Sequence, residues 1–216
     1  EDGIRDVAVT GVQTCALPIR LLVQQSIFEK FTQALAQAAT HFKVGDPSDP
    51  QTQIGPINNA KQYNHVKTMV EKALKDGATL VGQNADPIPA TPGYYINPTV
   101  LAGTNELECA QEEIFGPVMS ILTYDTEEEV IRRANDTDFG LAAGLVTKDL
   151  NRAHRVIHQL EAGICWINAW GESDAKMPVG GYKQAGVGRE NGISALNNFT
   201  RIKSVQGALG DYASVF

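Results

Sequence analysis

A short apolar run that leads into a glycine-rich segment is the feature that most constrains the fold of this chain. The run covers residues 164–172 and reads Ile-Cys-Trp-Ile-Asn-Ala-Trp-Gly-Glu. Its length and composition are typical of a buried strand, with a short buried helix as the alternative. The segment 177–191 that follows is rich in glycine. Because α/β proteins bind ligands in the loops that follow their strands, the sequence predicts a functional site here.

Strands and helices are expected to alternate along the rest of the chain. Short apolar runs predict strands at 21–23, 79–81, 94–101, 118–124 and 140–146. Amphipathic patterns predict helices at 27–42, 59–76, 127–135, 150–160 and 193–199. Such an alternation is typical of an α/β fold with a mainly parallel sheet flanked by helices.

Polar residues and one glycine mark where these helices should begin and end. Ser26, Thr126 (or its neighbour Asp125) and Asp149 are suited to cap the helices that follow them. Gly77 stands where a residue with positive φ commonly ends a helix. These signals fix expected boundaries independently of the hydrophobic pattern.

The composition excludes several classes of function. A net charge of −7 argues against nucleic acid as a partner, because phosphate binding needs a basic surface. No apolar run approaches the about 20 residues of a membrane span, and no secretory signal is recognised, so no membrane partner is expected. Three cysteines without a CxxC pair fit a reducing compartment, and we expect a cytoplasmic protein.

The chain divides into three parts of different character. Residues 1–19 lack helical or strand periodicity, and residues 9–19 resemble the in-frame translation of a sequencing adapter, so this part is expected to be non-native. Residues 20–199 are expected to form one catalytic domain. Residues 200–216 form a C-terminal arm with a strand-like stretch at 201–206, expected to serve in oligomerisation.

Three motifs, in the right order, resemble the aldehyde dehydrogenase family. They read Glu-Glu-Ile-Phe-Gly-Pro-Val at 112–118, Asn-Asp-Thr-Asp-Phe-Gly-Leu-Ala at 135–142 and Gly-Gly-Tyr-Lys-Gln-Ala-Gly-Val-Gly-Arg-Glu at 180–190. Within the family, the stretch 164–173 is similar to the betaine-aldehyde dehydrogenases. The resemblance covers residues 20–216, the catalytic domain and its arm.

The resemblance implies oxidation of a small-molecule aldehyde by a cysteine thiolate, with NAD or NADP as hydride acceptor. It implies that Glu113 holds the nicotinamide ribose hydroxyls, although the pair Glu112–Glu113 also reads as a solvated loop. A carboxylate only accepts hydrogen bonds, which suits a vicinal diol with two donors. Phe115 would pack near the nicotinamide. Glu190 matches a proton-relay carboxylate, with a salt bridge to Arg189 or another partner as the alternative.

A quaternary ammonium substrate and a potassium ion are also implied. Trp170 would face the ammonium group, which cannot donate a hydrogen bond and is recognised by aromatic faces. The alternative is that Trp166 and Trp170 both belong to the core. Lys183 and Gly186 match positions whose main-chain carbonyls bind potassium at a subunit contact; the Lys183 side chain is itself a cation and could not serve. A homo-oligomer is expected in the complete enzyme.

The position of the nucleophile departs from the family pattern. Cys15 lies five residues before Arg20, as the family nucleophile does before an arginine, but Gly11 is one place too early and the stretch resembles adapter sequence. Cys109 and Cys165 are off-motif and are expected to be buried small hydrophobes. Only residues 1–14 precede Cys15, whereas the family's cofactor-binding domain and general-base glutamate precede its nucleophile.

We therefore expect a fragment of an NAD(P)-dependent betaine-aldehyde dehydrogenase that is inactive in isolation. The alternatives are another subfamily of aldehyde dehydrogenases, or a catalytically silent α/β module that self-associates through its arm. The glycines around Gly188 do not make a dinucleotide fingerprint, because the third glycine, Gly192, is one position late. His154 and His158 are expected to lie on a solvated helix face rather than to bind a metal.

Overall fold

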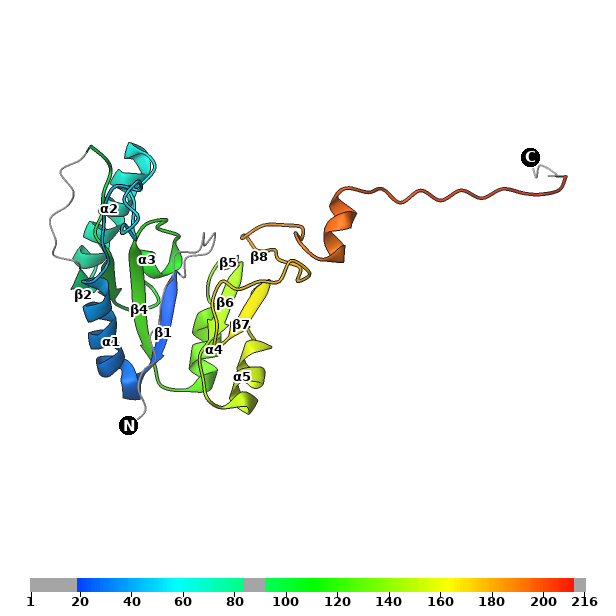
Figure 1. Cartoon of the computed structure of the whole chain (residues 1–216). Coiled ribbons are helices and arrows are strands. Elements are labelled where there is room, and N and C mark those ends of the chain that lie inside the picture. Colours follow the sequence, from blue (N-terminus) through cyan, green and yellow to red (C-terminus); the bar gives the residue numbers. More distant parts are fainter. Residues whose placement is uncertain (1–18, 84–91, 212–216) are drawn as a thin grey trace.

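The computed structural model describes residues 19–83 and 92–211, and it shows a mixed α/β fold with a four-stranded sheet (Figure 1). The strand order is β1-β4-β3-β2. The bounds are β1 (Arg20–Gln24), β4 (Val118–Tyr124), β3 (Thr99–Ala102) and β2 (Thr79–Gln83). The pairs β1–β4 and β4–β3 are parallel, whereas β2 is antiparallel to β3 at the edge. The expected mainly parallel sheet is confirmed.

The run expected to organise the fold lies outside this sheet. β7 (Ile164–Ile167) pairs only with β6 (Ala142–Leu145), in parallel. A second two-stranded sheet joins β5 (Phe139–Gly140) to β8 (Tyr182–Lys183), antiparallel. β7 ends earlier than expected because Asn168 takes a φ of 55°, which extended backbone does not tolerate.

The helices flank the strands and match the sequence prediction in order. Their bounds are α1 (Gln25–Ala39), α2 (Ala60–Lys75), α3 (Glu108–Gln111), α4 (Glu127–Asn135), α5 (Leu150–Ile157) and the 3₁₀ helix η1 (Ile193–Asn198). The short α3 was not predicted, since four residues give no helical period. The expected strand at 94–101 is shorter than predicted, because it begins only after Pro98, which has no N–H to donate.

Most of the predicted caps are confirmed. The side chains of Thr126 and Asp149 accept hydrogen bonds from backbone N–H groups in the first turns of α4 and α5, at 3.2 and 3.0 Å. Asn59, for which no cap was predicted, accepts in the same way from the first turn of α2, at 2.9 Å. Gly77 follows α2 with a φ of 105°. The cap at Ser26 was wrong: α1 begins at Gln25, directly after β1, and Ser26 lies inside it.

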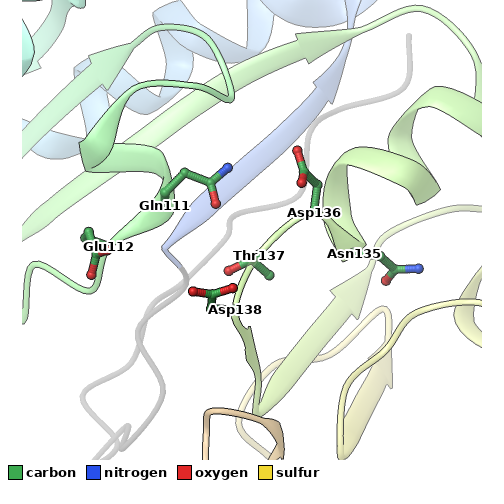
Figure 2. Close-up of a pocket in the computed structure, with 6 residues that line it drawn as sticks. All are labelled: Gln111, Glu112, Asn135, Asp136, Thr137 and Asp138. Atoms are coloured by element: carbon green, nitrogen blue, oxygen red, sulfur yellow. The ribbon is translucent and has the colours of Figure 1, made fainter.

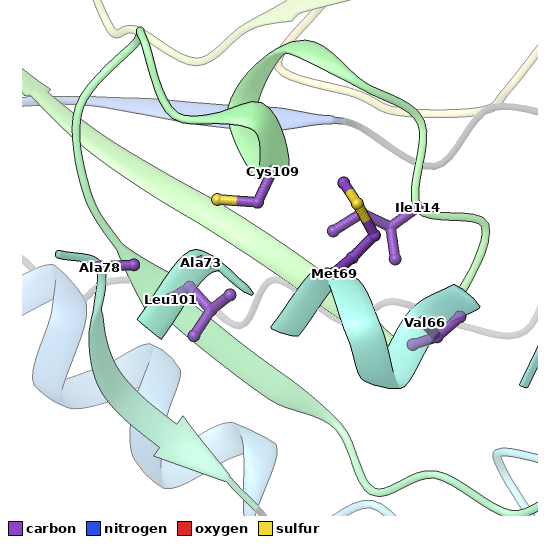
Figure 3. Close-up of a cluster of buried hydrophobic side chains, with 7 residues drawn as sticks. All are labelled: Val66, Met69, Ala73, Ala78, Leu101, Cys109 and Ile114. Atoms are coloured by element: carbon purple, nitrogen blue, oxygen red, sulfur yellow. The ribbon is translucent and has the colours of Figure 1, made fainter. Parts of the chain in front are cut away.

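Two hydrophobic clusters occupy the two faces of the four-stranded sheet. Leu101 packs with α2 and α3 residues, in the cluster Val66, Met69, Ala73, Ala78, Leu101, Cys109 and Ile114 (Figure 3). Its neighbour Val100 packs with α1, in the cluster Val23, Ala39, Val100 and Ile121. Because successive strand residues point to opposite faces, α1 covers one face and α2 the other. Cys109 is a buried core residue, as predicted, and burial raises the pKa of its thiol.

The C-terminal arm leaves the body of the molecule after η1 (Figure 1). Residues 200–211 form no strand, and Ile202, Val205 and Leu209 are fully or largely exposed. The strand expected at 201–206 therefore has no partner within the described part of this chain, and its pairing with a second subunit stays a prediction. No helix in the described ranges is long and apolar enough to span a membrane.

Candidate functional site

The loop that follows α3 presents an aromatic ring to solvent in a strained conformation. Phe115 has a φ of 50° and is 62% exposed. Bulky residues rarely adopt this left-handed region, and the cost is about 1–3 kcal/mol. The Gln62 side chain on α2 donates hydrogen bonds to the carbonyls of Ile114 and Phe115, at 2.7 and 3.2 Å. The loop is thus held in place from α2 while its ring points outward.

Glu113 lies in the same loop as a half-buried carboxylate with a perturbed pKa. Partial burial and the neighbouring charge of Glu112 together raise the pKa of Glu113 above its usual value. Both causes disfavour the ionised form. The folded chain therefore does not stabilise the negative charge of Glu113. Carboxyl groups with shifted pKa values are common at binding sites.

Replacing Glu113 with glutamine should stabilise the chain at neutral pH. A carboxyl whose pKa is raised in the folded state contributes favourably when protonated, and that contribution is lost as the pH rises through its folded pKa. The gain should be below about 1 kcal/mol because the group is only partly buried and solvent still screens its charge. Urea unfolding at several pH values checks this: the advantage of the variant over the parent should grow as the pH rises above about 4, where an ordinary glutamate ionises. A gain that shrinks as the pH rises would contradict the assignment.

A polar cavity of about 280 Å³ opens between this loop and the segment after α4 (Figure 2). It is lined by Gln111, Glu112, Asn135, Asp136, Thr137 and Asp138. The lining holds three carboxylates and two amides, so it suits donors such as hydroxyl groups. The 135–142 motif alone predicts no role for these side chains, because their proximity to Gln111 and Glu112 arises only in the folded chain.

A partly buried network of hydrogen bonds joins the two walls of this cavity. Arg20, at the start of β1, donates to Asn105 Oδ1 at 2.7 Å and to the carbonyls of Ala134 and Asp136 at 3.1 and 3.0 Å. Asn105 in turn donates to Asp136 Oδ2 at 2.8 Å and accepts at its carbonyl from Gln111 Nε2 at 2.7 Å. Burial lowers the pKa of Arg20 and the charge of Asp136 opposes this. Arg20 entered the sequence analysis only as a marker of spacing.

The glycine-rich segment folds back on itself and on the start of β7. Val179 and Glu190 exchange two backbone hydrogen bonds of 2.8 Å. Arg189 Nη1 donates to the carbonyls of Gly181 and Gly188 at 3.1 and 2.6 Å, and its guanidinium lies 5.1 Å from the centre of the Tyr182 ring. Arg189 therefore supports the loop from within. No ion pair joins it to Glu190 in the described ranges, and the Glu190 side chain is exposed.

Lys183 and Gly186 both have positive φ, at 51° and 131°, and both are exposed. A loop with such backbone can turn its carbonyl groups toward a cation, as the expected potassium site requires, and a side chain at Gly186 would meet nothing within 4 Å. The Lys183 ammonium points elsewhere: it bonds to Asn135, Thr137 and Glu161. No group of three or more His, Cys, Asp or Glu side chains that could hold a metal occurs among the residues described.

Trp170 lies just beyond β7 and packs against two neighbours, Trp166 and Gly144. Its ring centre is 5.0 Å from that of Trp166, at an angle of 50°. β7 ends at Ile167, so the contact does not arise from two residues on one face of a strand. A Cβ at Gly144 of β6 would come within 2.7 Å of Trp170 Cε3, so Gly144 is where the indole rests. Trp166 is half-buried and donates to the Glu172 carbonyl at 2.5 Å, whereas Trp170 is 38% exposed.

The predicted site residues come together only in part. Residues 135–138 line the cavity together with Glu112. The same residues are joined to the glycine-rich segment by a hydrogen bond of 2.9 Å from Gln184 N to Asp138 O. No hydrogen bond or ring contact links Trp170 to Glu113 or Phe115 within the described parts of the chain. Cys15 lies outside the described residues.

Comparison with known proteins identifies the family and the fold. A model of the aldehyde dehydrogenase family matches residues 4–205. Among solved structures, an aldehyde dehydrogenase variant from Bacillus cereus is 39% identical with a TM-score of 0.84, covering 89% of this chain and 39% of that one. An indole-3-acetaldehyde dehydrogenase of P. syringae, in complex with NAD+ and IAA, is 41% identical with a TM-score of 0.82, covering 86% and 38%.

A betaine aldehyde dehydrogenase from Staphylococcus aureus, in complex with NAD+, is 37% identical with a TM-score of 0.80, covering 83% of this chain and 37% of that one. The chain thus spans about two fifths of the length of the solved structures it matches. Because the family match extends over most of the sequence, the chain belongs to the aldehyde dehydrogenase family.

Proposed function

We propose that this chain is the catalytic-domain part of an NAD(P)-dependent betaine-aldehyde dehydrogenase. The observation that carries the proposal is the loop of Glu113 and Phe115, which presents a strained, exposed aromatic ring beside a carboxylate of raised pKa. Strain of this kind persists where the surrounding structure enforces it for a function. Family membership and the NAD+ complexes of two solved relatives support a nicotinamide dinucleotide as the ligand.

The residues of the loop fit such a cofactor. The Glu113 carboxylate would accept from both hydroxyls of a ribose, and the Phe115 ring would lie against the flat nicotinamide. When bound, the cofactor supplies the hydride acceptor. In the complete enzyme a cysteine thiolate, proposed to be Cys15, adds to the aldehyde carbonyl; after loss of hydride, water hydrolyses the thioester to the acid. Glu190 is proposed to relay the proton released in hydrolysis, and its exposed carboxylate is free of Arg189.

Trp170 is proposed to recognise the trimethylammonium group of betaine aldehyde. Its partial exposure and its fixed seat over Gly144 support this role, since a rigid, accessible indole suits a cation that cannot donate hydrogen bonds. The tilted contact with Trp166 would hold the ring in place. The same arrangement offers little to a simple aliphatic aldehyde.

Replacing Trp170 with alanine in the complete enzyme should lower kcat/KM for betaine aldehyde by about 2- to 30-fold, the equivalent of about 0.5–2 kcal/mol. Its neutral carbon analogue, 3,3-dimethylbutanal, has the same shape without the charge and is the matched control substrate. Its kcat/KM should change much less. Steady-state kinetics with both substrates measures the ratio, and an equal loss on the two would exclude recognition of the charge by Trp170.

Potassium, self-association and location complete the proposal. The exposed, left-handed backbone at Lys183 and Gly186 supports a potassium ion held by their carbonyls, because carbonyl oxygens can replace the ion's water shell. The unpaired arm with exposed Ile202, Val205 and Leu209 supports homo-oligomer formation through residues 200–216. The sparse cysteines support a cytoplasmic location.

A further inference from the structure

The side chain of Lys183 occupies a small oxygen-lined site of its own. Its ammonium donates to the carbonyl of Asn135 at 2.6 Å and to that of Thr137 at 3.1 Å. It also pairs with Glu161 Oε2 at 2.7 Å. The three oxygens belong to the end of α4 and to the residues between α5 and β7, so they lie 22 to 48 positions from Lys183 in the sequence.

The contacts to carbonyls distinguish this arrangement from an ordinary surface ion pair. The Lys183 side chain is 26% exposed, whereas that of Glu161 is 56% exposed. An exposed ion pair alone contributes little to stability. Two backbone carbonyls and one carboxylate together satisfy all three N–H donors of an ammonium group. The site therefore matches a monovalent cation in charge, in number of oxygens and in distance.

The backbone on both sides of Lys183 is paired with the stretch that supplies two of these oxygens. β8 pairs Lys183 with Phe139, and Gln184 N bonds to Asp138 O at 2.9 Å, so the glycine-rich segment is joined to the 135–140 stretch on both sides of Lys183. Lys183 itself adopts the left-handed region, which favours glycine over lysine. The joined stretch includes Asn135 to Asp138, which line the polar cavity.

We propose that the oxygens of Asn135, Thr137 and Glu161 form a monovalent-cation site that the Lys183 ammonium fills as a tethered ion. Lys183 is a positioning residue: it locks the glycine-rich segment onto the wall of the cavity. This site is separate from the proposed potassium site, which uses the Lys183 carbonyl. The inference holds for any family member with this geometry and does not require that betaine aldehyde be the substrate.

Removing the ammonium should create a dependence on small cations that the parent chain lacks. Lys183→Met keeps most of the apolar stem and removes the charge, and should lower Tm by about 4–8 °C in tetramethylammonium chloride. Ammonium or potassium chloride at the same ionic strength should recover about half of that loss, because both ions fit oxygens at 2.6–3.1 Å. Tetramethylammonium is too large and cannot donate. The measurement is thermal unfolding of the full chain in each salt.

Two controls separate this result from general salt effects. Lys176→Met removes an exposed lysine of the neighbouring loop, which forms no ion pair with the residues that the structure describes, and should behave as the parent in every salt. Potassium bound at the proposed carbonyl site would raise the Tm of the parent too. The test is therefore the rise in Tm of Lys183→Met beyond the rise seen in the parent in the same salt. The proposal would be overturned if the Tm of Lys183→Met were no higher in ammonium or potassium chloride than in tetramethylammonium chloride. It would also be overturned if Lys183→Met and Lys176→Met had the same Tm.

A double variant keeps the test decisive if Lys183→Met unfolds in all salts. Glu161→Gln combined with Lys183→Met removes the carboxylate that the first change leaves without its partner. The double variant should melt at a higher temperature than Lys183→Met at pH 7, and its recovery by ammonium should be smaller, because one charged oxygen is gone. Equal melting temperatures for the single and double variants would show that Glu161 does not belong to a cation site.

Discussion

Replacing Gly163 with alanine is expected to lower the free energy of unfolding by about 3 kcal/mol. A Cβ built at this position would lie 1.6 Å from the carbonyl oxygen of Gly180 and 2.8 Å from its carbonyl carbon. Backbone cannot yield as a side-chain end can, so the whole glycine-rich segment would have to move away from the start of β7. Gly163 N also donates to Gly140 O at 3.0 Å, which ties the same point to β5.

Urea unfolding followed by tryptophan fluorescence suits this variant, because both tryptophans, Trp166 and Trp170, lie in or just after β7. Gly207→Ala is the matched control: it makes the same change in the arm, where an added Cβ meets nothing within 4 Å. The control should unfold as the parent does. A Gly163→Ala chain as stable as Gly207→Ala would mean that the glycine-rich segment does not dock on β7 as described.

The elements that the sequence predicted well are those specified by neighbouring residues. Thr126 and the glutamates after it define the start of α4, and the short apolar run at 118–124 defines β4, so both bounds are confirmed. β7 was predicted too long because a left-handed Asn168 leaves no pattern of its own. The placement of β7 in a two-stranded sheet, rather than in the larger one, depends on contacts distant in sequence.

The candidate site shows the same division between local and distant information. Motifs identified Glu113, Phe115 and Lys183 as residues of interest, but they carry no information on geometry. No sequence pattern predicts a role for the Lys183 ammonium, because its partners are 22 to 48 residues away. The Arg20 network likewise joins residues 85 to 116 positions apart, which no short motif could reveal.

Replacing Gly116 with alanine should cost about 2 kcal/mol and disturb the loop that holds Phe115. A Cβ at Gly116 would lie 2.7 and 2.9 Å from the two methyl carbons of Val66, which is completely buried against α3 and β3 residues. Val66 has no free space into which to turn. The strain would therefore pass to Phe115, whose φ of 50° is already unfavourable, and to the hydrogen bonds from Gln62.

A double-mutant cycle tests that cause directly. Val66→Ala alone should destabilise the chain by about 2 kcal/mol, through lost burial and the cavity left behind. In that background the alanine at 116 gains the room of the missing methyl groups, so Gly116→Ala should cost at least about 1 kcal/mol less than in the parent. If the losses in free energy of unfolding of the two single variants simply added in the double variant, Val66 would not be the residue that requires glycine at position 116. A favourable coupling would establish that the hydrophobic core under α2 determines where Phe115 is presented, and so links the packing of one face of the sheet to the proposed cofactor contact.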